Sequence, residues 1–433
     1  MDTTPLITKD TIAFGILMLT LGFVFYTSSS ENKTWQKFYK IVPALLMAYM
    51  LPAIFTSLGI IAPEWTSINE TGELVKHKSQ LYYVASRFLL PASLVLLTLS
   101  IDLKAVLNLG PKALIMFFTG TVGIIIGGPL AILLISVISP ETLGGAGPDA
   151  VWRGLATLAG SWIGGGANQA AMLEIYGYNT KLYGGMVLVD IVVANIWMAI
   201  ILIGIGKSEK IDKWLKSDTS AIEALKEKVS TFSSKITKNP SLSDLIVILS
   251  IAFTIVGIAH LGADAISSFL IENVPAVSDK RSSLSSFGSQ FFWMISISTI
   301  LGIALSFTRF KTYEGAGASK VGSVFIYILV ATIGMKMDLT MIFDNPGLIL
   351  IGIVWMTIHA TLLIIVAKLV RAPYFFLAVG SQANVGGAAS APVVAAAFHP
   401  SLASVGVLLA VFGYVVGTYG AILTAELMRI VAP

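Results

Sequence analysis

The chain has 433 residues, of which 55% are hydrophobic and only 12% are charged, whereas soluble domains carry about 25% charged residues. This composition, with a mean hydropathy of +0.84, predicts an all-α polytopic membrane protein. The net charge of +4 does not indicate nucleic-acid binding, because the Lys and Arg residues lie in short loops between apolar segments. The absence of cysteine excludes disulfides, thiolate metal sites and cysteine nucleophiles.

A membrane-spanning helix needs about 20 mostly apolar residues. The first such segment lacks a basic region before it and a clear cleavage site after it, so we interpret it as a retained helix and not as a signal peptide. Five segments fall in each half of the chain, and in order they are 11–28, 39–61, 80–101, 112–138, 182–206, 242–261, 285–307, 319–337, 347–369 and 401–424.

A glycine-rich segment lies between the last two apolar segments of each half. Segment 152–176 contains Gly160-Ser161-Trp162-Ile163-Gly164-Gly165-Gly166-Ala167-Asn168-Gln169, and segment 373–397 contains Gly380-Ser381-Gln382-Ala383-Asn384-Val385-Gly386-Gly387-Ala388-Ala389-Ser390. Glycine runs are unfavourable inside helices. In lipid, broken backbone is tolerated only where protein buries it or where it lines a cavity. Matching breaks in two halves therefore predict a transport site.

The halves share the order of their elements, which predicts an internal duplication. If each glycine-rich segment is a re-entrant hairpin, each half has five crossings and the halves are inverted. Basic residues then gather on the side of loop 207–240, which is the cytoplasmic side by the positive-inside rule. We therefore predict two inverted repeats of five transmembrane helices, 1–206 and 241–433, with the N-terminus outside. A continuous but broken crossing helix in each half is the alternative.

The polar loop 207–240 joins the halves. Within it, Ser220-Ala221-Ile222-Glu223 has the pattern of a helix capping box, and the apolar residues that follow recur at helical spacing. We interpret this stretch as an amphipathic linker helix on the cytoplasmic surface. A regulatory or lipid-binding helix is the alternative.

Each hairpin arm before its break would be about ten to twelve residues long and would reach about half of the ~30 Å membrane core, so the two tips would meet near the midplane. Free carbonyls and side-chain oxygens at a tip suit Na⁺, and the N–H groups that begin the second arm suit an anionic substrate group. Tight helix packing through small residues is the alternative. The predicted substrate-binding residues are Ser161, Gly165, Gly166, Asn168, Gln169, Ser381, Gln382, Asn384, Gly386, Gly387, Ser390 and Arg87.

Ionisable residues inside apolar segments are costly and point to function. Asp190 is predicted to bind the coupling cation or proton, and Arg87 to anchor a substrate carboxylate, although a mutual ion pair between the two is equally open. His359 is interpreted as a buried neutral histidine bonded to a neighbouring helix, with a proton relay as the alternative. The predicted ion-coupling residues are Asp190, Asn195, Asn168 and Asn384.

The paired motifs beginning at Gly160 and Gly380 resemble those of a family of uncharacterised bacterial membrane proteins known only as a domain of unknown function. More distantly, the architecture is similar to the glutamate–sodium and hydroxycarboxylate–sodium symporters, in a clan that also holds bile-acid symporters and cation–proton antiporters. The resemblance implies a core domain that moves like an elevator and a scaffold domain that forms a homodimer, in the bacterial cytoplasmic membrane. It also implies hairpin vertices at Gly164–Gly166 and Gly386–Gly387.

We therefore expect a secondary transporter for a small organic anion, such as an amino acid, a hydroxycarboxylate or a short peptide. Na⁺ or H⁺ would be its coupling ion, with no other cofactor. A cation–proton antiporter that uses Asp190 is the alternative. An intramembrane hydrolase with Ser161 or Ser381 as nucleophile and His359 as base is disfavoured, because the familiar serine- and metallo-hydrolase motifs are absent from the sequence.

Overall fold

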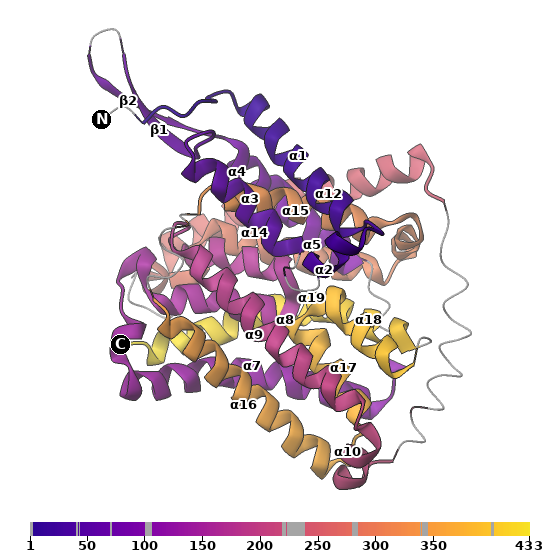
Figure 1. Ribbon diagram of the computed structural model, residues 1–433. Helices are drawn as coiled ribbons and strands as arrows, with labels where there is room; N and C mark the ends of the chain where they lie inside the picture. Colours follow the sequence, from indigo (N-terminus) through magenta and orange to yellow (C-terminus); the bar gives the residue numbers. More distant parts are fainter. Residues whose placement is uncertain are drawn as a thin grey trace.

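The computed structural model describes residues 3–39, 42, 44–69, 72–99, 106–218, 222, 239–278, 285–337, 339, 345–399 and 402–433. Within these ranges the chain is helical apart from one two-stranded hairpin, and its helices form two bundles (Figure 1). The predicted linker helix falls outside them except for Ile222, and so do Asp102 and Asp338, which directly follow the predicted segments 80–101 and 319–337.

The first bundle occupies the upper part of Figure 1 and draws its helices from both halves of the chain. A five-residue π-helical turn, η1 (Ala85–Leu89), interrupts its third predicted span. The other main elements are α1 (Asp10–Ser28), α2 (Lys33–Tyr39), α3 (Ala44–Ser57), α4 (Leu81–Val84), α5 (Leu90–Leu99), α12 (Leu242–Asn273), α14 (Gln290–Ser306) and α15 (Ala318–Gly334).

The second bundle contains both glycine-rich segments. It is also built from both halves of the chain, and the short helix α10 (Ser208–Leu215) closes one end of it. Its members are α7 (Pro111–Ile138), α8 (Val151–Tyr176), α9 (Tyr183–Ile205), α16 (Gly347–Leu369), α17 (Tyr374–Val385), α18 (Gly387–Phe398) and α19 (Ala403–Val431).

Among the described residues, seven helices are long and apolar enough to cross a membrane, or up to nine if each bent pair counts as one span. Each of the ten predicted spans coincides with a helix or with a set of consecutive helices. The largest difference is α12, which continues to Asn273, twelve residues beyond the predicted end at 261. The structure therefore supports a multi-pass membrane protein.

The β-hairpin was not predicted. Strands β1 (Glu64–Ile68) and β2 (Leu74–Lys78) pair antiparallel between α3 and α4, and Figure 1 shows them projecting from the first bundle. Trp65 stacks on His77 across the pair, with ring centroids 5.3 Å apart. The Asn69–Gly72 turn between two runs of β-forming residues was the available signal.

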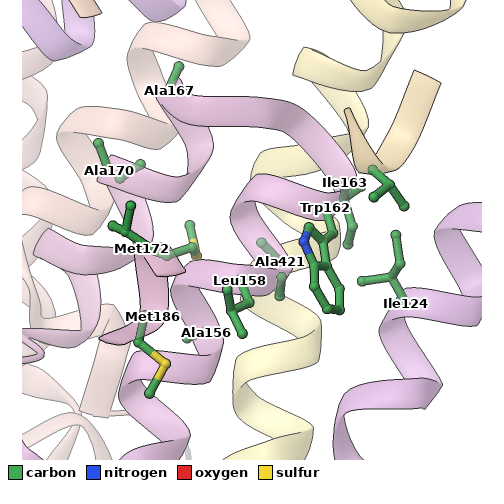
Figure 2. Close-up of a cluster of buried hydrophobic side chains, with 14 of the residues drawn as sticks. Ile124, Ala156, Leu158, Trp162, Ile163, Ala167, Ala170, Met172, Met186 and Ala421 are labelled. Carbon is green, nitrogen blue, oxygen red and sulfur yellow. The ribbon is translucent and has the colours of Figure 1, made fainter. Parts of the chain in front are cut away.

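The core of the second bundle surrounds the first glycine-rich segment. Figure 2 shows side chains from α8 packed with Ile124 of α7, Met186 of α9 and Ala421 of α19. Trp162 is fully buried there and lies edge-on against Trp355 of α16, with ring centroids 5.1 Å apart. Four helices thus hold the segment that contains the predicted site.

Candidate functional site

Helix α8 is a hairpin, not a straight helix. At Gly165 the backbone adopts φ 73° and ψ −171°, which breaks the helix. The Trp152 ring lies 5.6 Å from the Tyr176 ring, and Arg153 donates a hydrogen bond to the Tyr176 carbonyl, whereas a straight helix would separate residues 152 and 176 by about 36 Å. We call 151–176 hairpin 1. A broken helix that continues across does not fit these contacts.

Helices α17 and α18 form a second hairpin, 374–398, which we call hairpin 2. The chain turns at Gly387, whose φ of +55° favours glycine. The Phe375 and Phe398 rings lie 5.3 Å apart at its base. Nearer the tip, Ser390 donates a 2.7 Å hydrogen bond to Oε1 of Gln382. The vertices expected from the family resemblance are therefore confirmed in both hairpins.

The two hairpins enter the second bundle from opposite ends. The base of hairpin 1 is joined to the start of α9 by a short turn, whereas Tyr374 at the base of hairpin 2 donates to the Ile201 carbonyl near the end of α9. Their first arms meet on α19: a Cβ added at Gly413 would lie 3.0 Å from the Ile163 carbonyl oxygen and 3.2 Å from that of Ala383. The interior of the bundle therefore brings both breaks together, as the sequence predicts.

Asp190 of α9 ties the two arms of hairpin 1 together. Its Oδ2 accepts hydrogen bonds from Ser161 at 2.7 Å and from Gln169 at 3.2 Å, and its Oδ1 accepts one from the Trp162 indole at 2.7 Å. The residue is only 6% exposed. No basic side chain of the described chain pairs with this carboxylate, so its charge is balanced by neutral donors alone.

Asn168 of hairpin 1 connects that hairpin to α19. Its Nδ2 donates to the carbonyls of Gly164 and Tyr414, at 3.0 and 3.3 Å, and its Oδ1 accepts from Thr418 at 2.5 Å. A Cβ at Gly417 would lie 2.4 Å from the Gly164 Cα, so α19 must present glycine where it passes the tip. The Asn168 side chain thus links the backbone of hairpin 1 to the backbone of α19 through hydrogen bonds.

Asn384 of hairpin 2 makes the same set of bonds to α7. Its Nδ2 donates to the carbonyls of Gly380 and Phe117, at 2.9 and 3.0 Å, and its Oδ1 accepts from Thr121 at 2.8 Å. The chemistry repeats, but Asn384 lies on the first arm of its hairpin whereas Asn168 lies on the second. The two amides therefore do not occupy equivalent positions in their hairpins.

The chain matches a known family over most of its length. The family model described as "Protein of unknown function (DUF819)" covers residues 15–431. The chain belongs to the DUF819 family. A curated relative is the uncharacterized membrane protein YjcL of Bacillus subtilis, which is 25% identical over 397 residues, covering 88% of this chain and 89% of the relative. The resemblance to this family is thus confirmed.

Ser381 of the DUF819 chain has different partners from Ser161. It accepts a hydrogen bond from the Trp197 indole at 2.8 Å and lies 2.8 Å from Nε2 of His359, whose Nδ1 lies 3.0 Å from the Gly120 carbonyl. A carbonyl can only accept, so Nδ1 carries the proton and Nε2 accepts from Ser381. His359 is fully buried and, as the first interpretation held, bonded to a neighbouring helix.

Gln382 provides a free donor in hairpin 2 of the DUF819 chain. Its Oε1 accepts a hydrogen bond from the Ser390 hydroxyl, but its buried Nε2 has no hydrogen-bond partner among the residues that the structure describes. Buried polar groups are nearly always paired. Next to it, the turn at Gly387 faces open space, because a Cβ there would meet nothing within 4 Å. An acceptor group from a ligand would complete this arrangement.

Two predicted site residues lie elsewhere in the DUF819 chain. The suggested ion pair between Arg87 and Asp190 was wrong: Arg87 of η1 pairs with Glu174 near the base of hairpin 1, at 2.5 Å. Asn195 was predicted to take part in ion coupling, but it is exposed on α9 and donates to the Ile191 carbonyl of its own helix. Neither side chain reaches the hairpin tips.

Sequence reasoning missed several partners of the DUF819 site. Trp162 is absent from the predicted site residues, yet its indole N–H donates a hydrogen bond to Asp190. Trp197 holds Ser381, and it lies seven residues after Asp190, a spacing that places both on one helix face. That spacing was the available signal. The sequence carried no such signal for Glu174, because its partner Arg87 is remote in sequence.

Proposed function

We propose that the protein is a secondary active transporter for a small organic anion such as an amino acid, a hydroxycarboxylate or a short peptide. The observation that carries this proposal is the meeting of the two hairpins on Gly413 of α19. Broken backbone in a multi-pass protein leaves peptide dipoles without helix partners, and transporters use such breaks to hold a solute at mid-membrane. The site lies between the two tips.

Hairpin 1 supplies the ion-coupling side of this site. The Asp190 carboxylate accepts hydrogen bonds from Ser161 and Trp162 on the first arm and from Gln169 on the second. Binding of H⁺ or Na⁺ to it would therefore alter the contact between the arms. A buried carboxylate without a cationic partner favours uptake of a positive ion. Protonation requires only that the Ser161 hydroxyl reverse from donor to acceptor.

Hairpin 2 supplies the substrate side. Its free Gln382 Nε2 and the first N–H groups of α18 at Gly387 are donors near one turn. Helix N-termini and amide donors favour anionic groups. The carboxylate that bonds to hairpin 2, Asp212, lies at its base on the Tyr374 amide, so a substrate carboxylate at the turn would meet no repulsion of the kind that Asp190 creates in hairpin 1.

The two bundles support an elevator mechanism, in which the second bundle moves as the transport core against the first as a homodimeric scaffold. Both bundles draw helices from both halves of the chain. The Arg87–Glu174 ion pair and a hydrogen bond from Tyr82 to the same carboxylate join η1 and α4 of the first bundle to hairpin 1. Charged contacts of this kind can break and re-form without disrupting either hydrophobic core.

A cation–proton antiporter that uses Asp190 is the second candidate, because the same unpaired carboxylate could exchange ions without an anion. Proteoliposomes loaded with a pH-sensitive dye distinguish the two. Proton efflux on addition of Na⁺ alone supports the antiporter, whereas proton uptake that requires an external organic anion, or anion uptake without proton movement, supports the symporter.

A hydrolase is a weaker candidate despite the Ser381–His359 hydrogen bond. That pair resembles a nucleophile and its base, but Ser381 is fully buried and also accepts from Trp197. We expect a fluorophosphonate probe not to label the folded protein. Labelling that Ser381→Ala abolishes would support hydrolysis instead.

The transport proposal is tested first by ligand-dependent stability, because a ligand that binds the folded state raises its melting temperature. Purified protein is heated with glutamate, malate, citrate and dialanine, each with and without Na⁺. Any stabilising compound is then offered, radiolabelled, to proteoliposomes with an inward Na⁺ or H⁺ gradient. Gradient-dependent accumulation is the expected result, and its absence for every stabilising compound would contradict the proposal.

A further inference from the structure

A groove runs between α7 and α16 on the outside of the second bundle. Its volume is about 420 Å³, and several of its side chains, such as Phe118 and Val122, are exposed in the isolated chain. Its lining is apolar apart from one threonine. The lining residues are Leu114, Ile115, Phe118, Thr119, Val122, Leu362 and Val366.

The length of the groove matches one leaflet of a bilayer. Lys112, Ile115, Thr119 and Val122 recur at intervals of three or four residues and form one stripe along α7. The part of α7 that lines the groove runs from Leu114 to Val122, about 12 Å along the helix axis, and Lys112 extends the stripe to about 15 Å, which is half of the ~30 Å hydrocarbon core. An acyl chain of one leaflet would therefore fill it from end to end.

The Lys112 end of the groove lies at the level of lipid headgroups. Trp214 of α10 is 54% exposed, and exposed tryptophans concentrate at membrane–water interfaces. The Lys368 ammonium, near the end of α16, lies 3.7 Å from the centre of the Trp214 ring. Since α7 begins where α16 ends, the apolar groove starts directly below this interfacial layer.

Basic groups surround this end. The Lys112 ammonium donates to the Arg371 carbonyl at 3.2 Å and lies 3.8 Å from the Asp218 carboxylate. Arg371 is exposed, and its guanidinium has no hydrogen-bond or ion-pair partner within the described part of the chain. Lys112 and Arg371 thus present more positive charge than Asp218 offsets. A phosphodiester is the anion that would lie here above an acyl chain.

We propose that this groove is a binding site for an anionic phospholipid, with one acyl chain between α7 and α16 and the phosphate held by Lys112 and Arg371. Basic pockets between membrane helices at the cytoplasmic side favour anionic headgroups, at about 1 kcal/mol per Lys or Arg. The inner face of the same turns of α7 carries Phe117 and Thr121, which hold Asn384 of hairpin 2. A bound lipid would therefore border the helix that positions hairpin 2.

The experiment is native mass spectrometry of the delipidated full chain with dioleoyl phosphatidylglycerol or dioleoyl phosphatidylcholine. We expect the wild type to retain phosphatidylglycerol preferentially. Lys112→Ala with Arg371→Ala should weaken that binding about 25-fold, because each charge contributes about fivefold. The matched control, Lys33→Ala with Lys37→Ala on α2, removes two basic residues of another region and should change it less than twofold.

Equal retention of the two lipids by the wild type would overturn the proposal, and so would an equal loss in the control variant, which would indicate non-specific charge attraction. A groove-filling variant, Val122→Trp, should lose bound phosphatidylglycerol while its melting temperature stays near that of the wild type. The chain has no native cysteine, so a single cysteine introduced at Ile115, or at Leu362, tests whether a second copy of the protein occupies the groove. Efficient disulfide-linked dimers through them in phosphatidylglycerol vesicles would assign the groove to a second copy and overturn the lipid site.

Discussion

The glycine-rich motifs of the two hairpins begin with the same Gly-Ser pair, but their serines have different hydrogen-bond partners. Ser161 donates to the Asp190 carboxylate, whereas Ser381 accepts from the neutral indole of Trp197, which lies seven residues after Asp190 on α9, and bonds the His359 imidazole. Hairpin 1 is therefore built around a negative charge and hairpin 2 around neutral groups. The repeated motif determines the shape, and the neighbouring helices determine the chemistry.

The hairpins also differ in what holds their bases. Glu174 of hairpin 1 pairs with Arg87 of the first bundle, whereas the base of hairpin 2 is held inside the second bundle, where Asp212 of α10 accepts from the Tyr374 amide. Hairpin 1 is thus the one whose position depends on the relation between the bundles. In the proposed transporter, ion binding at Asp190 and movement of the core act on the same hairpin.

The largest effect on this comparison is expected from Asp190→Ala. Three buried donors lose their acceptor, and unpaired buried donors cost about 1–3 kcal/mol each when they cannot reach water. We expect the free energy of unfolding in detergent to fall by about 4 kcal/mol. Asn195→Ala on the same helix is the control and should cost less than 1 kcal/mol. Similar losses in both variants would remove the special role of the carboxylate.

A smaller effect is expected from Ser381→Ala, at about 2 kcal/mol, because the Trp197 indole and His359 Nε2 both lose their partner. If the three groups form one chain of hydrogen bonds, Trp197→Phe should destabilise the Ser381→Ala protein less than it destabilises the wild type. A double-mutant cycle in thermal or chemical unfolding measures the difference. Additive losses of stability would show that these three hydrogen-bonded side chains do not act as a unit.

The Arg87–Glu174 pair should contribute about 1–2 kcal/mol of coupling, since Arg87 is partly exposed and Glu174 nearly buried. The cycle of Arg87→Ala, Glu174→Ala and the double variant tests this. Lys78→Ala with Glu64→Ala, an exposed pair on the β-hairpin, is the control and should show almost no coupling. Equal coupling in the two cycles would contradict an ion pair that joins the bundles at hairpin 1.

The smallest change in stability is expected for Gln382→Leu, because its Nε2 has no partner to lose and its Oε1 gives up a single hydrogen bond, from the partly buried Ser390 hydroxyl. The free energy of unfolding without ligand should change by at most about 1 kcal/mol. The stabilisation by an anionic ligand, measured by thermal shift, should disappear. If Gln382→Leu keeps the full ligand-induced shift while Gln169→Leu abolishes it, the two hairpins have the opposite roles.

The sequence predicted the elements well because long apolar runs and glycine breaks are local properties. The ten apolar segments that coincide with helices and both vertices, at Gly165 and Gly387, follow from residues adjacent in the chain. Partners that are remote in sequence could not be inferred in the same way. Arg87 and Asp190 lie at similar depth in their spans, yet their depth says nothing about the face of the helix that each occupies.

The two asparagines show the same limit. Asn168 and Asn384 stand close to equivalent glycines, so the motif suggested equivalent ligands. Their arms differ, and each amide bonds the backbone of a different long helix. The signal that separates them is the order of Gly and Asn within each motif, since the glycine run precedes Asn168 and follows Asn384.

The most direct test of the account is gradient-driven accumulation by Asp190→Asn in proteoliposomes. The probe is the radiolabelled anion that most stabilises the wild type, and the drive is an inward Na⁺ or H⁺ gradient. The account predicts that the wild type accumulates the anion above its external concentration, whereas the folded Asp190→Asn protein only equilibrates it. Accumulation by Asp190→Asn to the wild-type level would contradict the assignment of ion coupling to hairpin 1.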